Sequence, residues 1–290
     1  MRDSSPMDLE KLTAEIDHLS TLPDIVFKIM ELTNDKNSGA DDLVKVIQTD
    51  PSITTKVLRM VNAPYYAVAN EIYDVKKAIV RLGFRAIREI SLTVSVCELF
   101  KSKSNIHGYK RSELWRHLVG VAILAKMISE RMNLALSNQA FSAGLLHDIG
   151  IILMDQYCQD DFIKVMQNSS ENKRCVCECE KEVLTFDHQM LSYGVFEKSE
   201  IPDSIADVMR YHHQPQNSKE YAALNSLIYI ADKLCNSFQI GYVDHCEIDN
   251  PTFNYCLNEL NIRSIDVKVF VEEFPELLNS AVESYTSILN

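Results

Sequence analysis

The segment Gly144-Leu145-Leu146-His147-Asp148-Ile149-Gly150 places a histidine and an aspartate next to each other inside an apolar run. Aspartate is rarely buried unless it is paired or bound to a cation. Imidazole and carboxylate groups are also the ligands that suit zinc, iron and manganese. The segment therefore predicts a buried polar centre between packed helices, which is either a metal site or a structural, hydrogen-bonded pair of His147 and Asp148.

Residues of the same two types recur on both sides of this segment, within or beside helical patterns. They include five of the eight histidines, and the whole series is His117, His147, Asp148, His188, His212, His213 and Asp232. His147 and Asp148 offer two ligands from one rigid segment, so further ligands must come from other helices, here His117 and Asp232. The series predicts three helices held around one ion.

The paired histidines near the end of the series carry a geometric condition. Neighbouring residues point about 100° apart on an α-helix. His212 and His213 can therefore serve one cluster only if the helix ends there, as Pro215 indicates. The other histidines are assigned to hydrogen-bonded core positions or to the surface, and they are His18, His107 and His245.

The rest of the sequence is typical of an all-α protein. Glycine and proline number only 8 each among 290 residues, about half of their usual combined share. Apolar residues recur at helical spacing, and no alternation is long enough to predict a sheet. Trp115 is expected in the core. We also expect a helix or helix pair over residues 139–154, a polar loop over 168–174 and a helix over 178–195.

Several separate motifs resemble one known family. Upstream they are Leu22-Pro23, Asp50-Pro51-Ser52-Ile53, residues 57–66 (VLRMVNAPYY) and residues 78–83 (AIVRLG). Downstream they are Glu180, eight residues before His188, then Ile201-Pro202 and Tyr211-His212-His213-Gln214-Pro215. Together with the His147–Asp148 segment, they resemble the HDOD domain, an HD-related output domain of bacterial signalling proteins, over roughly residues 16–240.

The resemblance implies a fold and a metal site. It implies a two-lobed helical bundle with a lead-in helix (1–20), an N-terminal lobe (21–108), an HD-like metal-binding lobe (109–240) and a C-terminal helical extension (241–290). In the HD superfamily of metal-dependent phosphohydrolases, a His, a His-Asp pair and a later Asp take the metal, which implies His117, His147, Asp148 and Asp232. The other three histidines match the additional ligands of two-metal relatives such as the HD-GYP phosphodiesterases. The implied cofactor is divalent iron, manganese or zinc.

The chain departs from the catalytic relatives on the substrate side. Ile151 stands where HD-GYP enzymes carry a lysine, and an isoleucine cannot engage a phosphate or assist proton transfer. No Gly-Tyr-Pro loop follows His213, because the chain continues Gln214-Pro215-Gln216. Three further residues differ from those common in the HDOD pattern and affect only the expected packing. Thr185 and Ser192 replace glycine, and Ser199 replaces tryptophan.

The net charge of −12, from 41 acidic and 29 basic residues, disfavours direct binding of nucleic acid. One basic group would meet an anionic partner if its members shared a face, and otherwise it is a solvated helix surface: Lys76, Lys77, Arg81, Arg85 and Arg88. No apolar stretch is long enough to span a membrane, and the first ten residues lack a signal core.

We therefore expect a cytoplasmic protein whose eight cysteines stay reduced. Cys175, Cys177 and Cys179 lack the Cys-x-x-Cys spacing of zinc sites, so they are interpreted as three thiols at a helix start, with a metal or redox role as the alternative.

Two functions follow from these observations. The first is a stand-alone regulatory protein that acts through a signalling partner or a small ligand and retains a divalent metal. The second is a metal-dependent phosphohydrolase acting on a nucleotide or another phosphoester. Ile151 and the absent Gly-Tyr-Pro loop predict weak or no hydrolysis of cyclic dinucleotides.

Overall fold

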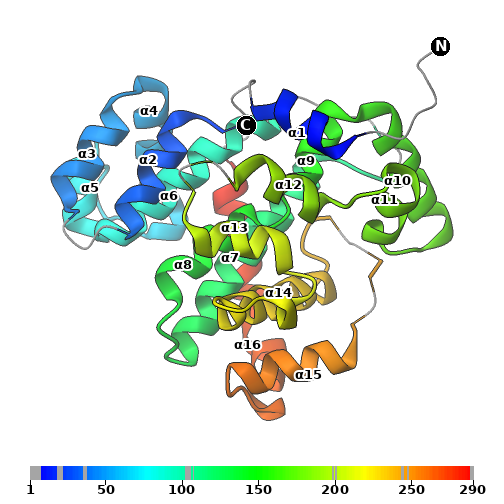
Figure 1. Cartoon of the computed structure of the whole chain (residues 1–290). Coiled ribbons are helices and arrows are strands. Elements are labelled where there is room, and N and C mark those ends of the chain that lie inside the picture. Colours follow the sequence, from blue (N-terminus) through cyan, green and yellow to red (C-terminus); the bar gives the residue numbers. More distant parts are fainter. Residues whose placement is uncertain are drawn as a thin grey trace.

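A computed structural model describes residues 8–17, 22–34, 38–101, 106, 108–197, 199, 201–242, 245–246 and 248–287. This part of the chain is helical, and an isolated bridge between Ile106 and Tyr109 is its only β-type pairing. The all-α prediction is confirmed (Figure 1). His18 and His107 lie outside the described residues.

The N-terminal lobe is a cluster of short amphipathic helices (Figure 1). Its helices are α2 (Asp24–Asn34), α3 (Ala40–Gln48), α4 (Pro51–Val61), α5 (Val75–Leu82) and α6 (Phe84–Val96), with 3-10 turns η1 (Pro64–Tyr66) and η2 (Cys97–Phe100). The Asp50 carboxylate caps α4 by accepting the backbone N–H groups of Ser52 and Ile53 at 2.7 and 3.2 Å, and Pro51 occupies the first turn. The Asp50-Pro51 pair therefore starts the helix as its sequence predicts.

The second lobe is built around one long buried helix, α7 (Arg111–Arg131). Packed around and beyond it are α8 (Ser137–Leu146), α9 (Ile149–Tyr157), α10 (Gln159–Asn172), α11 (Val176–Leu184), α12 (His188–Phe196), α13 (Asp203–Tyr211), η3 (Pro215–Asn217) and α14 (Ala222–Ser237). Trp115 of α7 is fully buried, as predicted. Helices α2 and α6 contact α8, so the N-terminal lobe packs directly on the second lobe.

The two ends of the chain pack on the second lobe. Helix α1 (Leu9–Asp17) lies against α12, where a Cβ on Gly194 would come within 2.8 Å of the Thr13 methyl group. After α15 (Asn250–Glu259), α16 (Ser264–Thr286) runs along α7 and reaches η1 of the N-terminal lobe (Figure 1). The hydroxyl groups of Tyr66 and Tyr285 lie 2.5 Å apart there. Helix α16 therefore joins both lobes.

Two local predictions were wrong. The expected loop over residues 168–174 is helical as far as Asn172, because Ser169 lies on the buried face of α10 and the helix continues through it. The expected helix over residues 178–195 is broken between α11 and α12. Thr185 adopts a left-handed φ of 71°, and the Asp187 side chain caps a new helix by accepting the N–H of Met190. This break places His188 at a helix start.

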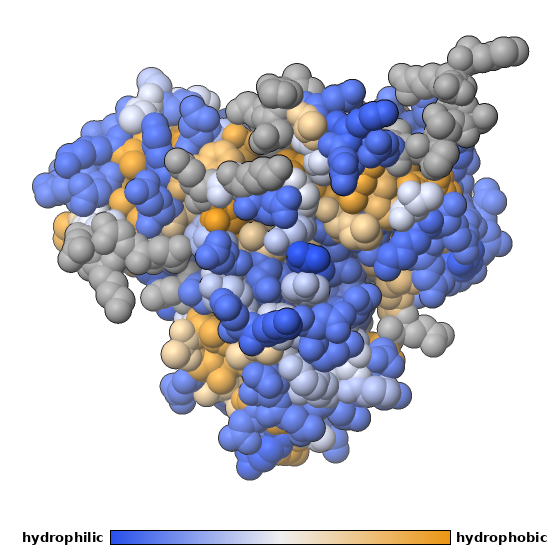
Figure 2. All heavy atoms as spheres, viewed as in Figure 1, coloured by the Kyte–Doolittle hydropathy of each residue, from blue (hydrophilic) through white to orange (hydrophobic). Residues whose placement is uncertain are grey.

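The surface is mostly hydrophilic on the face shown in Figure 2, with separate apolar patches. The basic group does not form one exposed patch, because Lys76, Lys77 and Arg81 are exposed whereas Arg85 is half-buried and Arg88 is buried. This arrangement favours the solvated-surface interpretation. No helix in the described ranges is both long and apolar enough to cross a membrane.

Candidate metal centre

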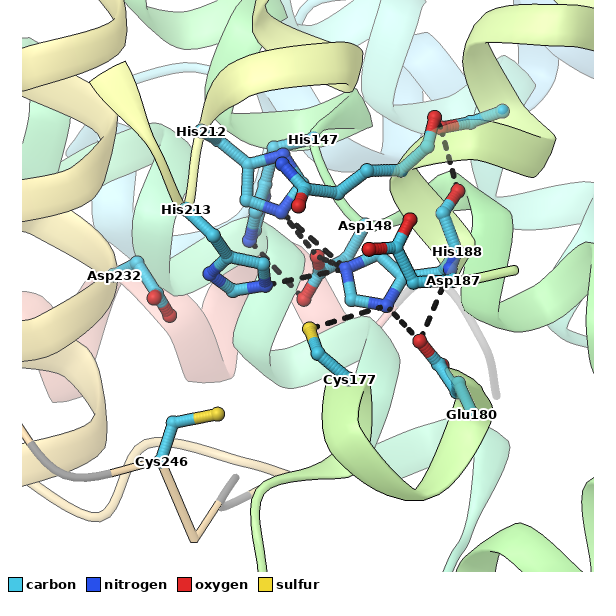
Figure 3. A network of polar contacts seen from close by, with 12 residues as sticks. His147, Asp148, Cys177, Glu180, Asp187, His188, His212, His213, Asp232 and Cys246 are labelled. Carbon is cyan, nitrogen blue, oxygen red and sulfur yellow. Dashed lines mark hydrogen bonds and ion pairs between the residues drawn. The ribbon is translucent and has the colours of Figure 1, made fainter. Parts of the chain in front are cut away.

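Five separate segments bring the predicted ligands together, and all of these residues except His117 are labelled in Figure 3. His117 lies within α7, His147 and Asp148 join α8 to α9, His188 begins α12, the histidine pair follows α13, and Asp232 lies within α14. Six of the seven side chains are at most 6% exposed, and His213 is half-buried. Helix α13 ends at Tyr211, before Pro215, as the sequence predicted. His212 and His213 can therefore both face the cluster.

The His147–Asp148 segment is a corner between two helices. His147 ends α8 in helical conformation, and Asp148 precedes α9 with φ −102° and ψ 21°. Two residues later, a Cβ on Gly150 would lie 2.1 Å from the carbonyl oxygen of His188. Only a glycine allows this approach of α9 to α12, so Gly150 brings His188 next to Asp148.

One donor group gathers around Oδ2 of Asp148. The Nε2 atoms of His147 and His117 lie 3.2 and 3.8 Å from this oxygen. His117 Nε2 also lies 3.2 Å from Oδ1 of Asp232. Two imidazoles and two carboxylates from three segments thus surround one position.

A second donor group gathers around the other oxygen of Asp148. The Nε2 atoms of His188 and His212 lie 3.1 and 3.0 Å from Oδ1. His188 Nε2 also lies 3.4 Å from His212 Nε2 and 3.3 Å from His213 Nε2. Asp148 therefore connects two groups of donors, with one oxygen directed at each.

Hydrogen bonds on the far side of three rings fix their tautomers. Nδ1 of His147 donates to the carbonyl oxygen of Gly144 at 2.8 Å, and Nδ1 of His212 donates to that of Val208 at 2.9 Å. A carbonyl oxygen can only accept, so both Nδ1 atoms carry the proton. With Nδ1 engaged in this way, each ring turns Nε2 toward the centre, which is the orientation of a metal-bound histidine.

His188 is oriented in the same way by a carboxylate. Glu180 accepts the Nδ1–H of His188 at 2.8 Å and its backbone N–H at 3.0 Å, both at Oε2. The sequence had singled out Glu180 as part of a motif but gave it no role. The structure shows that it holds the His188 ring against Asp148.

Unsatisfied polar atoms indicate that the residues present fit a metal ion. Among the described residues, Nε2 of His147 and Oδ1 of Asp148 are buried without a partner in hydrogen-bonding geometry. Such atoms are costly unless something compensates for their lost hydration. The mixed set of imidazoles and carboxylates suits divalent iron, manganese or zinc.

Electrostatic interactions within the cluster oppose the effects of burial on the carboxylates. Burial alone would raise the pKa of Asp148, but His147 and His188 outweigh it and hold this pKa well below its ordinary value of 3.8. Burial would likewise raise the pKa of Asp232, but Lys233 and His117 lower it far below the same value. Both carboxylates are therefore ionised, which is the form that binds a metal.

The histidines divide into two pairs. Burial would lower the pKa of His147 and of His188, but in both cases nearby anionic groups outweigh it and the pKa is raised. The group that raises the pKa of His147 is Asp148. Those that raise the pKa of His188 are Glu180, Cys177 and Asp148. Burial lowers the pKa of His212 and, more strongly, of His213. The raised pKa values favour the protonated forms of His147 and His188 beside the carboxylates, and the lowered values favour the neutral forms of His212 and His213.

A buried lysine beside the cluster was missed by sequence reasoning. Lys233 is 4% exposed, and its ammonium lies 3.4 Å from Oδ2 of Asp232. The one available signal was its position within the long apolar run of α14.

The cysteine prediction was wrong for one pair, because Cys175 forms a disulfide with Cys246. The two residues are 71 positions apart, so spacing within the cysteine-rich segment could not reveal the pairing. His245, next to Cys246, is half-buried near the surface, as expected.

Solved structures share this fold. A crystal structure of an HDOD domain protein of unknown function from Geobacter sulfurreducens superposes with a TM-score of 0.82 at 25% identity, covering 96% of this chain and 97% of that one. A candidate signal transduction protein from Marinobacter aquaeolei gives 0.77 at 19% identity, covering 97% and 66%. A candidate phosphohydrolase from Shewanella amazonensis gives 0.70 at 18% identity, covering 96% and 98%.

Sequence comparison identifies the family. An uncharacterized protein of Treponema pallidum is 20% identical over 219 residues, which are 75% of this chain and 42% of that protein. This chain therefore spans less than half the length of that curated relative. The HDOD domain pattern matches residues 19–215. With this match and the helical architecture around the clustered histidines, the chain belongs to the HDOD domain family.

Proposed function

We propose that this protein is a regulatory module in signal transduction, which binds a divalent metal at the His/Asp cluster and acts through contacts with a protein or a small ligand. The observation that carries the proposal is the closure of the cluster. Six of its seven side chains are almost completely buried. Structural metal sites are closed by protein ligands, whereas catalytic sites keep a position open for water and substrate.

The residue that follows the His-Asp motif supports a non-catalytic role. Ile151 is 2% exposed within α9. It occupies the position at which catalytic HD-GYP relatives carry a lysine, so this chain offers no ammonium there. Phosphoryl transfer depends mainly on positioning and charge stabilisation around phosphorus. The proposed metal ligands would therefore act without this substrate contact.

Phosphohydrolase activity is the second candidate, and the position of Asp148 favours it. Its two oxygens face two separate groups of donors. Pairs of bridged ions are a common arrangement in phosphoester hydrolysis, where a bound metal activates water. In such a reaction Asp148 would orient the donors, and substrate would have to approach past the half-buried His213.

Metal analysis followed by an activity panel separates the two candidates. Purified protein should contain iron, manganese or zinc, and added metal should raise its melting temperature. The loaded protein should then hydrolyse neither a chromogenic phosphodiester nor nucleotides. Absence of metal together with no thermal shift would reject both candidates, whereas robust metal-dependent turnover would favour the phosphohydrolase.

A further inference from the structure

A third group of donors lies on the opposite side of the His188 ring from Asp148. Cys177, Glu180 and His188 each offer one ligand-type atom, and these atoms lie within 4.8 Å of one another. Cys177 and Glu180 are on α11, about one helical turn apart, and His188 begins α12 (Figure 3). The group is therefore formed by two helices that the Thr185–Asp187 break brings together.

The distances are close to those of a tetrahedral site. Cys177 Sγ lies 3.9 Å from His188 Nδ1, and Glu180 Oε2 lies 2.8 Å from the same nitrogen. Tetrahedral zinc bonds of ordinary length place sulfur and nitrogen about 3.6 Å apart, and nitrogen and oxygen about 3.3 Å apart. Movements of about half an ångström would satisfy both values.

The Glu180 carboxylate shows that the group is incomplete. The residue has no exposed surface, and one of its oxygens, Oε1, is buried without a hydrogen-bond partner. The other oxygen accepts two hydrogen bonds from His188. A buried carboxylate oxygen left in this way is costly, and a cation bound beside Cys177 would offset that cost.

Two features of the surroundings bear on the Cys177 thiol. Cys177 is partly exposed and is not in a disulfide, whereas Cys175 is bound to Cys246. The disulfide fixes the start of α11 to the segment that follows α14. The sulfur that lies next to His188 is therefore that of Cys177, a residue that is partly exposed.

We infer that Cys177, Glu180 and His188 form an additional binding position for a thiophilic divalent cation of the zinc class, with water as the fourth ligand. The ion replaces the proton that His188 Nδ1 shares with Glu180, so the imidazole bridges this position and the Asp148 cluster. Binding releases that proton and the thiol proton of Cys177, so two protons leave for each ion bound. The position shares His188 with the Asp148 cluster, but its occupancy does not require the proposed regulatory role.

Cadmium titration of the purified protein tests the inference, because a thiolate–cadmium bond produces an ultraviolet charge-transfer band. The wild type, Cys177→Ala and Cys179→Ala should be compared without added reductant, after their accessible thiols have been counted. Cys179 is the matched control, since it lies on the same helix but is fully buried. The band should appear in the wild type and in Cys179→Ala and disappear in Cys177→Ala, with the loss of one equivalent of bound cadmium.

Two results would overturn the inference: no band in the wild type, or an unchanged band in Cys177→Ala. Glu180→Gln guards against an indirect effect of the alanine substitution, because it keeps the sulfur and removes the carboxylate charge. It should retain the band but require at least tenfold more cadmium for half-saturation. Manganese, which avoids thiolate ligands, reports separately on the Asp148 cluster and should bind Cys177→Ala as tightly as the wild type.

Discussion

Glu180 accepts both the backbone N–H and the ring Nδ1–H of His188 at a single carboxylate oxygen, at 3.0 and 2.8 Å. One residue thus fixes the start of a helix and the orientation of an imidazole. The backbone bond holds the first residue of α12, and the ring bond directs Nε2 at Asp148. The local fold and the chemistry of the cluster depend on the same side chain.

Glu180→Gln should weaken manganese binding by about 10- to 100-fold, because carboxylates that orient metal-bound histidines have effects of this size. Equilibrium competition with a metal chelator measures the affinity. The matched control is Glu182→Gln on the same helix, whose exposed ion pair with Arg174 should contribute little. Equal affinities in all three proteins would mean that Glu180 has no part in metal binding.

Asp148→Ala should abolish the stabilisation that metal gives, because this residue faces both donor groups. Ligand at about 100 times its dissociation constant stabilises a protein by about 2.7 kcal/mol, and the wild type should show a gain of this order with manganese. The variant should show none. Glu171→Ala, an exposed substitution on α10, should behave like the wild type. A normal gain in Asp148→Ala would contradict the assignment.

The stability of the metal-free protein should be greatest near pH 6.5, the ordinary pKa of histidine. Below that pH, His212 and His213 have lowered pKa values in the fold, so unfolding takes up protons and stability rises with pH. Above pH 6.5, His147 and His188 act in the opposite direction, because the fold raises their pKa values. Their contribution to stability is complete below about pH 6.5 and is lost as the pH rises through their pKa values in the folded protein.

Urea unfolding of chelator-treated protein between about pH 5 and pH 9 measures this profile. With manganese bound, stability should continue to rise above pH 6.5, because protons then compete less for the imidazoles. A metal-free profile that rises steadily across the whole range would show that protons on His147 and His188 do not stabilise the cluster.

Gly150→Ala should destabilise the fold by about 3 kcal/mol, the upper end of the usual range for overpacking. The added Cβ would meet backbone atoms of His188, which cannot move without displacing α12. Gly39→Ala is the control, since its nearest neighbour would be 4.0 Å away and the cost should stay below about 1 kcal/mol. Chemical denaturation measures both, and similar losses would show that α9 and α12 can separate freely.

Hydrolysis of cyclic dinucleotides by the manganese-loaded wild type should be at or below detection. One missing electrostatic contact commonly costs about 10² to 10³ in rate, and Ile151 supplies none. Ile151→Lys is the informative variant, and any activity should rise in it if its melting temperature shows that it folds. Rapid turnover by the wild type would refute the regulatory proposal.

The sequence predicted the helical class through local signals, and it singled out the clustered residues through their types and through the family resemblance. Apolar spacing indicates helices, and histidine and aspartate in buried runs demand partners. Capping and proline chemistry predicted that one helix begins at Asp50-Pro51 and that another ends before Pro215. Those rules act within a few residues, so one sequence suffices to read them.

Other features depend on contacts that no local pattern encodes. The break at Thr185 needs a left-handed residue, which threonine rarely adopts, so the pattern favoured a continuous helix. The Cys175–Cys246 pairing joins distant segments. Lys233 looked like an ordinary helix residue, and its burial against Asp232 became visible only once α14 was placed beside α7.

Helix α16 lies outside the residues that match the family, yet it is part of the packed fold. The family pattern ends at residue 215, but α16 buries Phe270, Phe274 and Leu278, lies along α7 and reaches the N-terminal lobe through Tyr285. A fragment cut at the end of the family match would uncover this apolar surface and tend to self-associate. A chimaera that transfers this HDOD region to another protein would therefore have to include α16 as well.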